Sequence, residues 1–164
     1  MTPRTMILGL ALVAGCGNSG LDNQPPNGAN LDARASGTVN GTFQTAMRCV
    51  FNAPGALGFT KFNLLSPKSP GAGIYTFGFS ATVLGAPTVA HYGEREAQIT
   101  ASMRLIDDTF LTSDVNSQNR IDITKVGSTT AQEDGSTVFD VHGTAAGTVA
   151  SRENNKYVDF IVDF

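Results

Sequence analysis

Histidine and carboxylate side chains are the residues of this chain best suited to general acid–base catalysis or to holding a metal ion. The sequence contains two histidines, His91 and His142, which lie far apart and share no spacing typical of metal ligands. His91 stands in a polar stretch with Glu94 and Glu96 and is the better candidate for a site residue. His142 follows Asp140 on a predicted strand and is expected to face solvent. Catalysis would require one of these histidines to meet a carboxylate within hydrogen-bond reach in a cleft.

A second stretch is also rich in carboxylates. These carboxylates could form a calcium-binding loop, or they could simply be solvated on the surface. Asp114 opens a run with the rhythm of such a loop, and Asp107 and Asp108 precede it closely. The run then departs from the calcium pattern, because Asn119 occupies the position of the glycine and Lys125 that of the bidentate glutamate. The three aspartates are therefore weak candidates, and we expect neither a metal nor a cofactor.

Other catalytic motifs are missing from the sequence. It has no Gly-x-Ser-x-Gly elbow, no His-Glu-x-x-His pair, no phosphate-binding glycine loop and no paired Cys-x-x-Cys. The residues therefore predict a protein that is not an enzyme.

The N-terminal residues have the composition of an export signal. Arg4 lies beside the initiating amine, and an apolar run extends from Met6 to Val13. The run is shorter than the roughly 20 apolar residues that a membrane-spanning helix requires. The sequence therefore predicts a secretory signal peptide that is removed.

The end of this signal resembles the lipobox of bacterial lipoproteins, in which an apolar residue and two small residues precede an invariant cysteine. The matching residues are Val13-Ala14-Gly15-Cys16, and the resemblance covers only the first sixteen residues. It implies that Cys16 is acylated through its sulfur and becomes the new N-terminus. Because Gly17 rather than aspartate follows, the resemblance also implies the outer membrane as destination.

An alternative for Cys16 is a disulfide. An ordinary signal cleaved nearby would leave Cys16 able to pair with Cys49, the other cysteine of this chain. Cys49 alternates with Met47 and Phe51, so we expect it to point into a core as a small hydrophobe.

Length and composition predict one folded domain behind a linker. The predicted parts are a signal peptide over 1–15, the lipidated cysteine and a flexible linker over 16–33, and an all-β domain over 34–164. The linker contains Pro25-Pro26 and Asn27-Gly28 and has no helical or strand period, so it should span roughly 20–25 Å.

Charge limits the partners. Once Arg4 is removed, ten basic residues remain against fourteen acidic ones. A nucleic-acid partner would need a clustered basic face. The expected partners are the membrane, through the acyl anchor, and an envelope protein or a small ligand.

Alternation of apolar and polar residues dominates the chain from Ser36 onward. The predicted strands lie around 39–44, 47–51, 57–65, 75–83, 96–105, 120–126, 136–150 (one long or two short) and 157–164. Eight or nine antiparallel strands with short links predict an antiparallel β-sandwich or a small closed β-barrel of about eight strands.

Three functions follow from this pattern. We expect a non-catalytic, lipid-anchored protein of the cell envelope with a binding or structural role. A lipocalin-like barrel holding a small ligand is the first alternative. The second is a small outer-membrane β-barrel, since Val158, Phe160, Val162 and Phe164 resemble the closing strand of such proteins. The absence of Trp and the presence of only three Tyr work against it, because aromatic girdles could not be built.

Overall fold

The chain folds into an all-β domain of ten antiparallel strands. The computed structural model describes residues 31–52, 58–113, 118–151 and 153–164. The strands are β1 (Leu31–Gly37), β2 (Gly41–Asn52), β3 (Phe59–Leu65), β4 (Ile74–Leu84), β5 (Ala90–Gly93), β6 (Gln98–Leu105), β7 (Phe110–Thr112), β8 (Arg120–Ala131), β9 (Thr137–Ser151) and β10 (Lys156–Asp163). The predicted fold class is confirmed. Across these ranges no helix has the length and apolar content to cross a membrane.

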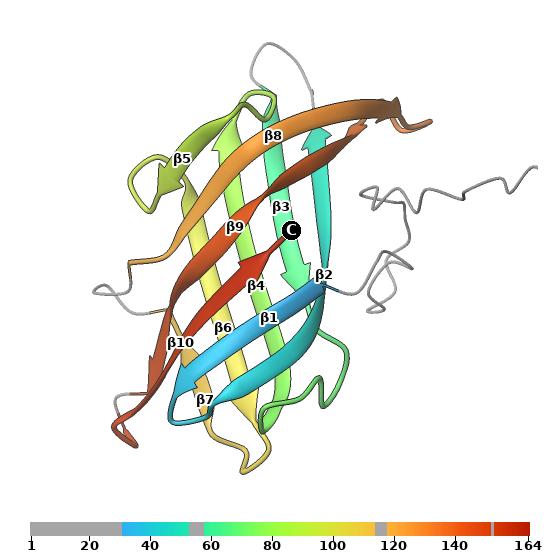
Figure 1. Ribbon diagram of the computed structural model, residues 1–164. Coiled ribbons are helices and arrows are strands. Elements are labelled where there is room, and N and C mark those ends of the chain that lie inside the picture. Colours follow the sequence, from blue (N-terminus) through green and yellow to red (C-terminus); the bar gives the residue numbers. More distant parts are fainter. Residues whose placement is uncertain (1–30, 53–57, 114–117, 152) are drawn as a thin grey trace, which may run out of the picture.

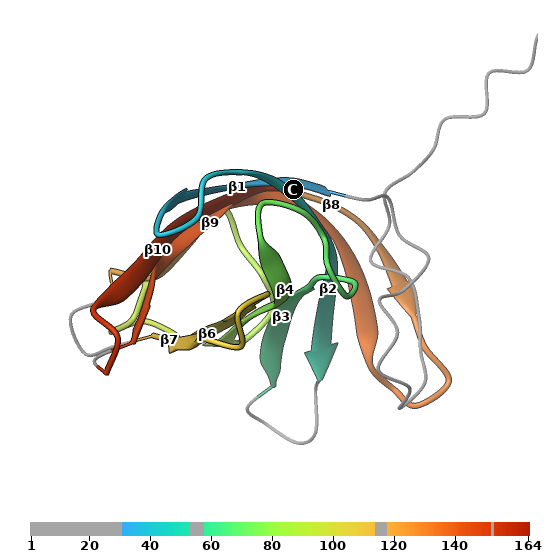
Figure 2. The same ribbon diagram turned by 90° about the horizontal axis from the view of Figure 1, so that it is seen from below.

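The strands form a single sheet that curls into a partly closed ring (Figure 1). The ring runs from β9 through β10, β1, β2, β3, β4 and β6 to β7, and β7 returns to β9 through the pair Thr112 and Ala150. Strand β8 continues from the same edge of β9, and β5 pairs with β8. Seen from below, β1, β9 and β10 make one wall, and β3, β4 and β6 make the opposite wall (Figure 2).

Alternation along the strands fills the ring with apolar side chains. On β4, Phe77, Phe79, Ala81 and Val83 are buried, while the residues between them are partly exposed. The sequence predicts Tyr75 on this inner face, and that prediction is wrong. A bulge between Ile74 and Thr76 shifts the register, so that Ile74 is buried instead. Tyr75 lies outside the core, with the Arg104 guanidinium 5.5 Å from its ring centroid.

Aromatic rings from the two walls meet inside the ring. The ring centroid of Phe160 on β10 lies 5.1 Å from that of Phe77 and 5.9 Å from that of Phe79, both on β4. Phe43 on β2 lies 5.2 Å from Phe77. All of these contacts have the edge-to-face geometry that aromatic pairs prefer. Aromatic side chains therefore fill the interior between β4 and β10.

Several strand boundaries differ from the prediction for local reasons. Strand β1 starts at Leu31, before the predicted boundary at residue 34, and its buried face carries alanines, which give a weak apolar signal. The predicted strands at 39–44 and 47–51 are one strand, β2, since Thr45 is also buried and no turn residue separates them. Strands β5 and β7 are too short for alternation to reveal.

Strand β9 is continuous from Thr137 to Ser151, so the sheet does not break at the glycines within it. A Cβ on Gly143 would lie 2.0 Å from the backbone oxygen of Asp122, and a Cβ on Gly147 would lie 1.7 Å from Asn119 Oδ1. Glycine is therefore required at both positions for β8 and the residues before it to approach β9. The predicted final strand, with Val158, Phe160 and Val162 buried, is confirmed as β10.

Candidate functional site

The outer face of β1, β10, β9 and β8 carries a row of side chains that begins and ends with arginine. Arg34 pairs with Ile161, Ile161 with Ala146, and Ala146 with Arg120. Because neighbouring strands lie about 4.8 Å apart, the Cα atoms of the two arginines are about 14 Å apart. We call this face the charged wall.

Carboxylates lie on both sides of the arginine row. Asp163 lies 3.7 Å from an Arg34 Nη and accepts a hydrogen bond from Thr144 at 3.1 Å. Asp122 accepts one from Arg120 Nε at 3.3 Å. On the other side of the row, Asp159 accepts a hydrogen bond from Thr148 at 2.6 Å. The charged wall thus alternates acidic and basic rows, and each arginine has a carboxylate beside it, whereas Asp159 forms no ion pair with a described residue.

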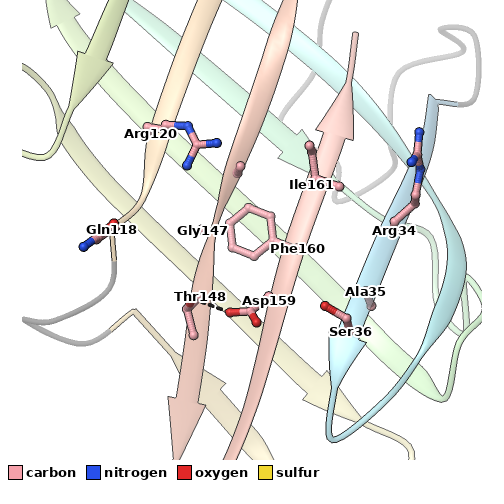
Figure 3. A pocket seen from close by; sticks show the side chains of 11 residues that line it. Arg34, Ala35, Ser36, Gln118, Arg120, Gly147, Thr148, Asp159, Phe160 and Ile161 are labelled. Carbon is pink, nitrogen blue, oxygen red and sulfur yellow. Dashed lines mark hydrogen bonds between the residues drawn. The ribbon is translucent and has the colours of Figure 1, made fainter.

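A groove of about 570 Å³ lies in the middle of this wall (Figure 3). Its polar lining includes Arg34, Ser36, Gln118, Arg120, Thr148 and Asp159, and its apolar lining includes Ala35, Ala146, Phe160 and Ile161. Gly147 completes the floor. The volume falls in the range of small-molecule sites. We call it the charged groove.

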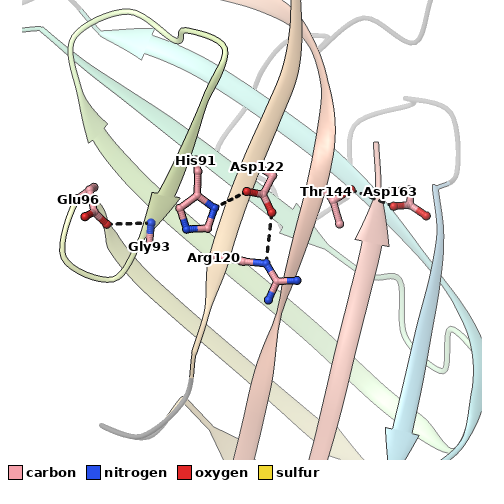
Figure 4. A network of polar contacts seen from close by, with 7 residues as sticks. All are labelled: His91, Gly93, Glu96, Arg120, Asp122, Thr144 and Asp163. Atoms are coloured by element: carbon pink, nitrogen blue, oxygen red, sulfur yellow. Dashed lines mark hydrogen bonds and ion pairs between the residues drawn. The ribbon is translucent and has the colours of Figure 1, made fainter.

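His91, the better histidine candidate, does meet a carboxylate. It lies opposite Asp122 in the pairing of β5 with β8, and its Nδ1 contacts an Asp122 oxygen (Figure 4). The other Asp122 oxygen accepts the bond from Arg120, which links the three side chains. The side chain of His91 is 62% exposed, and neither His91 nor Asp122 lines the charged groove. The pair therefore stands on an open surface. Nearby, Glu96 accepts a hydrogen bond from the Gly93 amide at 3.0 Å.

Two of the aspartates considered as calcium ligands, Asp107 and Asp108, contact basic side chains. Asp107 and Asp108 lie in the turn between β6 and β7. Lys156 donates to Asp107, as does the Thr109 amide at 3.1 Å, and these hydrogen bonds, the one from Lys156 above all, lower the pKa of Asp107 to about 2. Asp108 lies 2.9 Å from an Arg104 Nη.

Asp114 lies outside the described residues. Within the described ranges, no three histidine, cysteine or acidic side chains gather in a way that could hold a metal ion.

The remaining candidates occupy separate places. Cys49 is fully buried in the core, as its alternation with Met47 and Phe51 predicts. Cys16 lies outside the described residues. His142 is exposed, with Nε2 3.8 Å from an Asp140 oxygen.

A second groove, of about 440 Å³, lies on the outer face of β3, β4, β6 and β7. Its lining is Asn63, Leu65, Gly78, Phe79, Ser80, Thr100, Ala101, Ser102, Thr112 and Ser113. None of these residues carries a charge, and most of the polar ones are serine or threonine. We call it the hydroxyl groove.

The sequence pattern does not predict either groove. Alternation predicts which side chains face outward, but it does not predict which strands pair. Arg34 and Ile161 are neighbours in space and far apart in the chain.

None of the protein-family models, curated proteins or solved structures with which the chain was compared matches it. No activity, ligand or partner is therefore carried over from a relative. Among the described residues, the two grooves and the contacts of His91 are the candidate functional features.

Proposed function

We propose that this chain is a lipid-anchored protein of the cell envelope, held at the outer membrane by acyl groups on Cys16, whose β domain binds and does not catalyse. The anchor is supported by the apolar run that ends in Val13-Ala14-Gly15-Cys16. Residues 17–30 separate Cys16 from Leu31, where β1 begins. A linker of that composition would hold the domain roughly 20 Å from the lipid surface.

The charged groove is the observation that supports a binding role for the outer surface. It has the volume of a small-molecule site and brings together two arginines and a carboxylate over an apolar floor. Such a combination orients a ligand through a few polar groups while apolar contacts contribute affinity.

A catalytic role for His91 has less support. General acid–base catalysis benefits from a site that excludes water, because electrostatic interactions are stronger there. His91 and Asp122 stand beside the charged groove and do not line it. The contacts of His91 and Asp122 are typical of cross-strand polar pairs on a sheet surface.

A lipocalin-like function would require an enclosed ligand cavity. The contacts of Phe160 with Phe77 and Phe79 occupy the space between opposite walls at this level of the ring. Both grooves described above open on the outer surface of the sheet.

A small outer-membrane barrel would require the opposite distribution of side chains. Such barrels expose an apolar band to lipid and enclose polar residues. Here the inner face holds Phe43, Phe79 and Val162, all at most 2% exposed, and the outer face holds Arg34 and Asp163. An arginine or lysine on a lipid-facing surface costs about 2–4 kcal/mol near the bilayer midplane.

The anchor is tested by producing the full chain in a bacterium with an outer membrane. We expect the intact mass to show acylation at Cys16, and the protein to partition into the detergent phase and fractionate with the outer membrane. Cys16→Ser should abolish the acyl mass and the partitioning. Cys49→Ala, the matched control, should keep both. An unmodified Cys16 in the mature wild-type chain, or a Cys16–Cys49 disulfide, would refute the proposed anchor.

A further inference from the structure

We propose that the charged groove binds a short zwitterionic peptide, whose carboxylate contacts Arg120 and whose ammonium contacts Asp159. This inference rests on the binding role proposed above and names the class of ligand. It follows from which donors and acceptors of the groove are engaged, from their separation and from the charge balance of the wall.

Arg120 has hydrogen-bond donors that no described residue uses. Its Nε donates to Asp122 at 3.3 Å, and this fixes the plane of the guanidinium group. The two terminal amino groups have no hydrogen-bond partner among the described residues, and the side chain extends from β8 toward β9 (Figure 3). A guanidinium held at one edge presents two parallel donors, which match a carboxylate. Arg120 is therefore the carboxylate-binding end of the groove.

Asp159 supplies the opposite charge. One of its oxygens accepts a hydrogen bond from Thr148 at 2.6 Å, which orients the carboxylate. Its second oxygen has no hydrogen-bond partner within the described ranges, and no lysine or arginine there forms an ion pair with it. A primary ammonium donates up to three hydrogen bonds and fits this carboxylate.

The separation of the two groups selects the length of the ligand. Asp159 lies two residues along β10 from Ile161, and Ile161 is two strands away from Arg120. With about 4.8 Å between strands and about 3.4 Å per residue, the two Cα atoms lie about 12 Å apart. Both side chains reach inward from these positions. A peptide of two or three residues, at most about 3.6 Å per residue, spans the remaining gap.

The floor of the groove explains why the ligand is held by side chains. Ile161 is 37% exposed, and Ala146 and Gly147 beside it are small, which leaves a flat apolar strip between the two charges. The backbones of β9 and β10 pair with each other along this strip. A peptide could therefore lie across the strip but could not add to the sheet as a new strand.

Charge balance disfavours a purely anionic ligand. Arg34 lies near Asp163, and Arg120 is bonded to Asp122, so each arginine already has a carboxylate beside it. Asp159 would repel a second negative group. A ligand that carries one charge of each sign gains at both ends and meets no uncompensated repulsion.

The test uses the full mature chain in detergent micelles and trialanine as the probe. Titration followed by amide chemical shifts should move the signals of Arg120, Ala146, Asp159 and Ile161. N-acetylation or C-amidation of the probe should each weaken binding by about tenfold or more, as expected for loss of a charged hydrogen bond. Arg120→Gln and Asp159→Asn should have effects of similar size. Lys125→Gln, a control at an exposed position of the same strand as Arg120, should leave binding unchanged.

Each variant should also change which end of the probe matters. Arg120→Gln should make binding insensitive to amidation and keep its sensitivity to acetylation, and Asp159→Asn should do the reverse. Equal binding of the blocked and unblocked probes, tighter binding of glutarate than of trialanine, or no shift of groove signals at saturating probe would overturn the proposal. These outcomes are read independently of acylation at Cys16, so failure of the groove and failure of the anchor are distinguishable.

Discussion

The charged groove and the hydroxyl groove lie on opposite walls of one ring and differ in chemistry more than in size. They measure about 570 and 440 Å³, and each is formed by the outer faces of four strands. The charged groove has Arg34, Arg120 and Asp159 in its lining, whereas no lining residue of the hydroxyl groove is charged. The inner faces of both walls pack into the same apolar core, whereas their outer faces carry different side chains.

The glycines of the two grooves show how differently the walls are built. Gly147 faces Asn119, which is 1% exposed, and a Cβ would lie 1.7 Å from its Oδ1. Gly78 in the hydroxyl groove would place a Cβ 3.7 Å from Leu65 and Ser102, an ordinary contact distance. The charged wall thus depends on the close approach of Asn119 to Gly147, whereas the face that carries the hydroxyl groove has no such close approach at Gly78.

The largest expected effect concerns the interior that both walls share. Phe160→Ala should lower the free energy of unfolding by about 3–5 kcal/mol, because it removes the ring that contacts Phe77 and Phe79 and leaves a cavity. Urea denaturation followed by circular dichroism measures this. Phe110→Ala, at a site that is 59% exposed, should cost less than about 0.5 kcal/mol. Equal losses for the two variants would contradict a packed interior.

The second effect separates the two grooves directly. Gly147→Ala should cost about 1–3 kcal/mol, since either Asn119 or the backbone of β9 must move. Gly78→Ala should change the free energy of unfolding by no more than about 0.5 kcal/mol, because the added methyl group meets no close atom. The same denaturation experiment compares them. If Gly78→Ala proved the more damaging, the contrast drawn between the two walls would be wrong.

The sequence predicts the inner faces of the walls well and their outer surfaces poorly. Burial of Phe160 and Met103 is predicted by period-two alternation alone, because each strand must present an apolar face to the core. The grooves depend on register between strands that are distant in the chain. Arg34 meets Ile161, and Arg120 meets Ala146, through pairings that no local pattern specifies.

The sequence also does not predict polar contacts between distant residues, because these contacts depend on the same strand pairings. The contact of His91 with Asp122 joins residues 31 positions apart, and that of Asp107 with Lys156 joins residues 49 apart. The sequence identifies the titratable side chains but not their partners. Tyr75 shows that alternation can also fail locally, because one bulge places this side chain on the face opposite to the predicted one.

A third and smaller effect is expected at the edge of the hydroxyl groove. The Ser113 hydroxyl accepts a hydrogen bond from the Ala101 amide at 2.6 Å and donates one to the Ala101 carbonyl at 3.0 Å. It thereby provides the acceptor for the Ala101 amide just beyond the end of β7, where the Ser113 amide also donates to the Ala101 carbonyl at 2.8 Å. Ser113→Ala should cost about 1 kcal/mol. Ser102→Ala, a control in the same groove, should cost less than about 0.5 kcal/mol. A comparable loss in both variants would mean that the hydroxyl of Ser113 has no special role.

The last effect is confined to acid pH and concerns the contact that joins the two walls where the ring closes. Lys156 on β10 donates to Asp107 and, at 2.9 Å, to Thr109 in the turn after β6. The hydrogen bond from Lys156, followed by those from Thr109, lowers the folded-state pKa of Asp107 from 3.8 to about 2. A lowered carboxyl pKa contributes stability that is present above the unfolded pKa and is lost as pH falls through the folded value.

Asp107→Asn should therefore destabilise the protein above about pH 4 and lose that effect progressively as pH falls toward about 2. Urea denaturation of both proteins across this window measures the difference. Asp108→Asn, in the same turn, is the matched control and should not reproduce the pH dependence. A constant difference between wild type and Asp107→Asn from pH 6 to pH 2 would show that the ring closes without help from this charge. This side of the ring would then close through the pairing of Thr112 on β7 with Ala150 on β9.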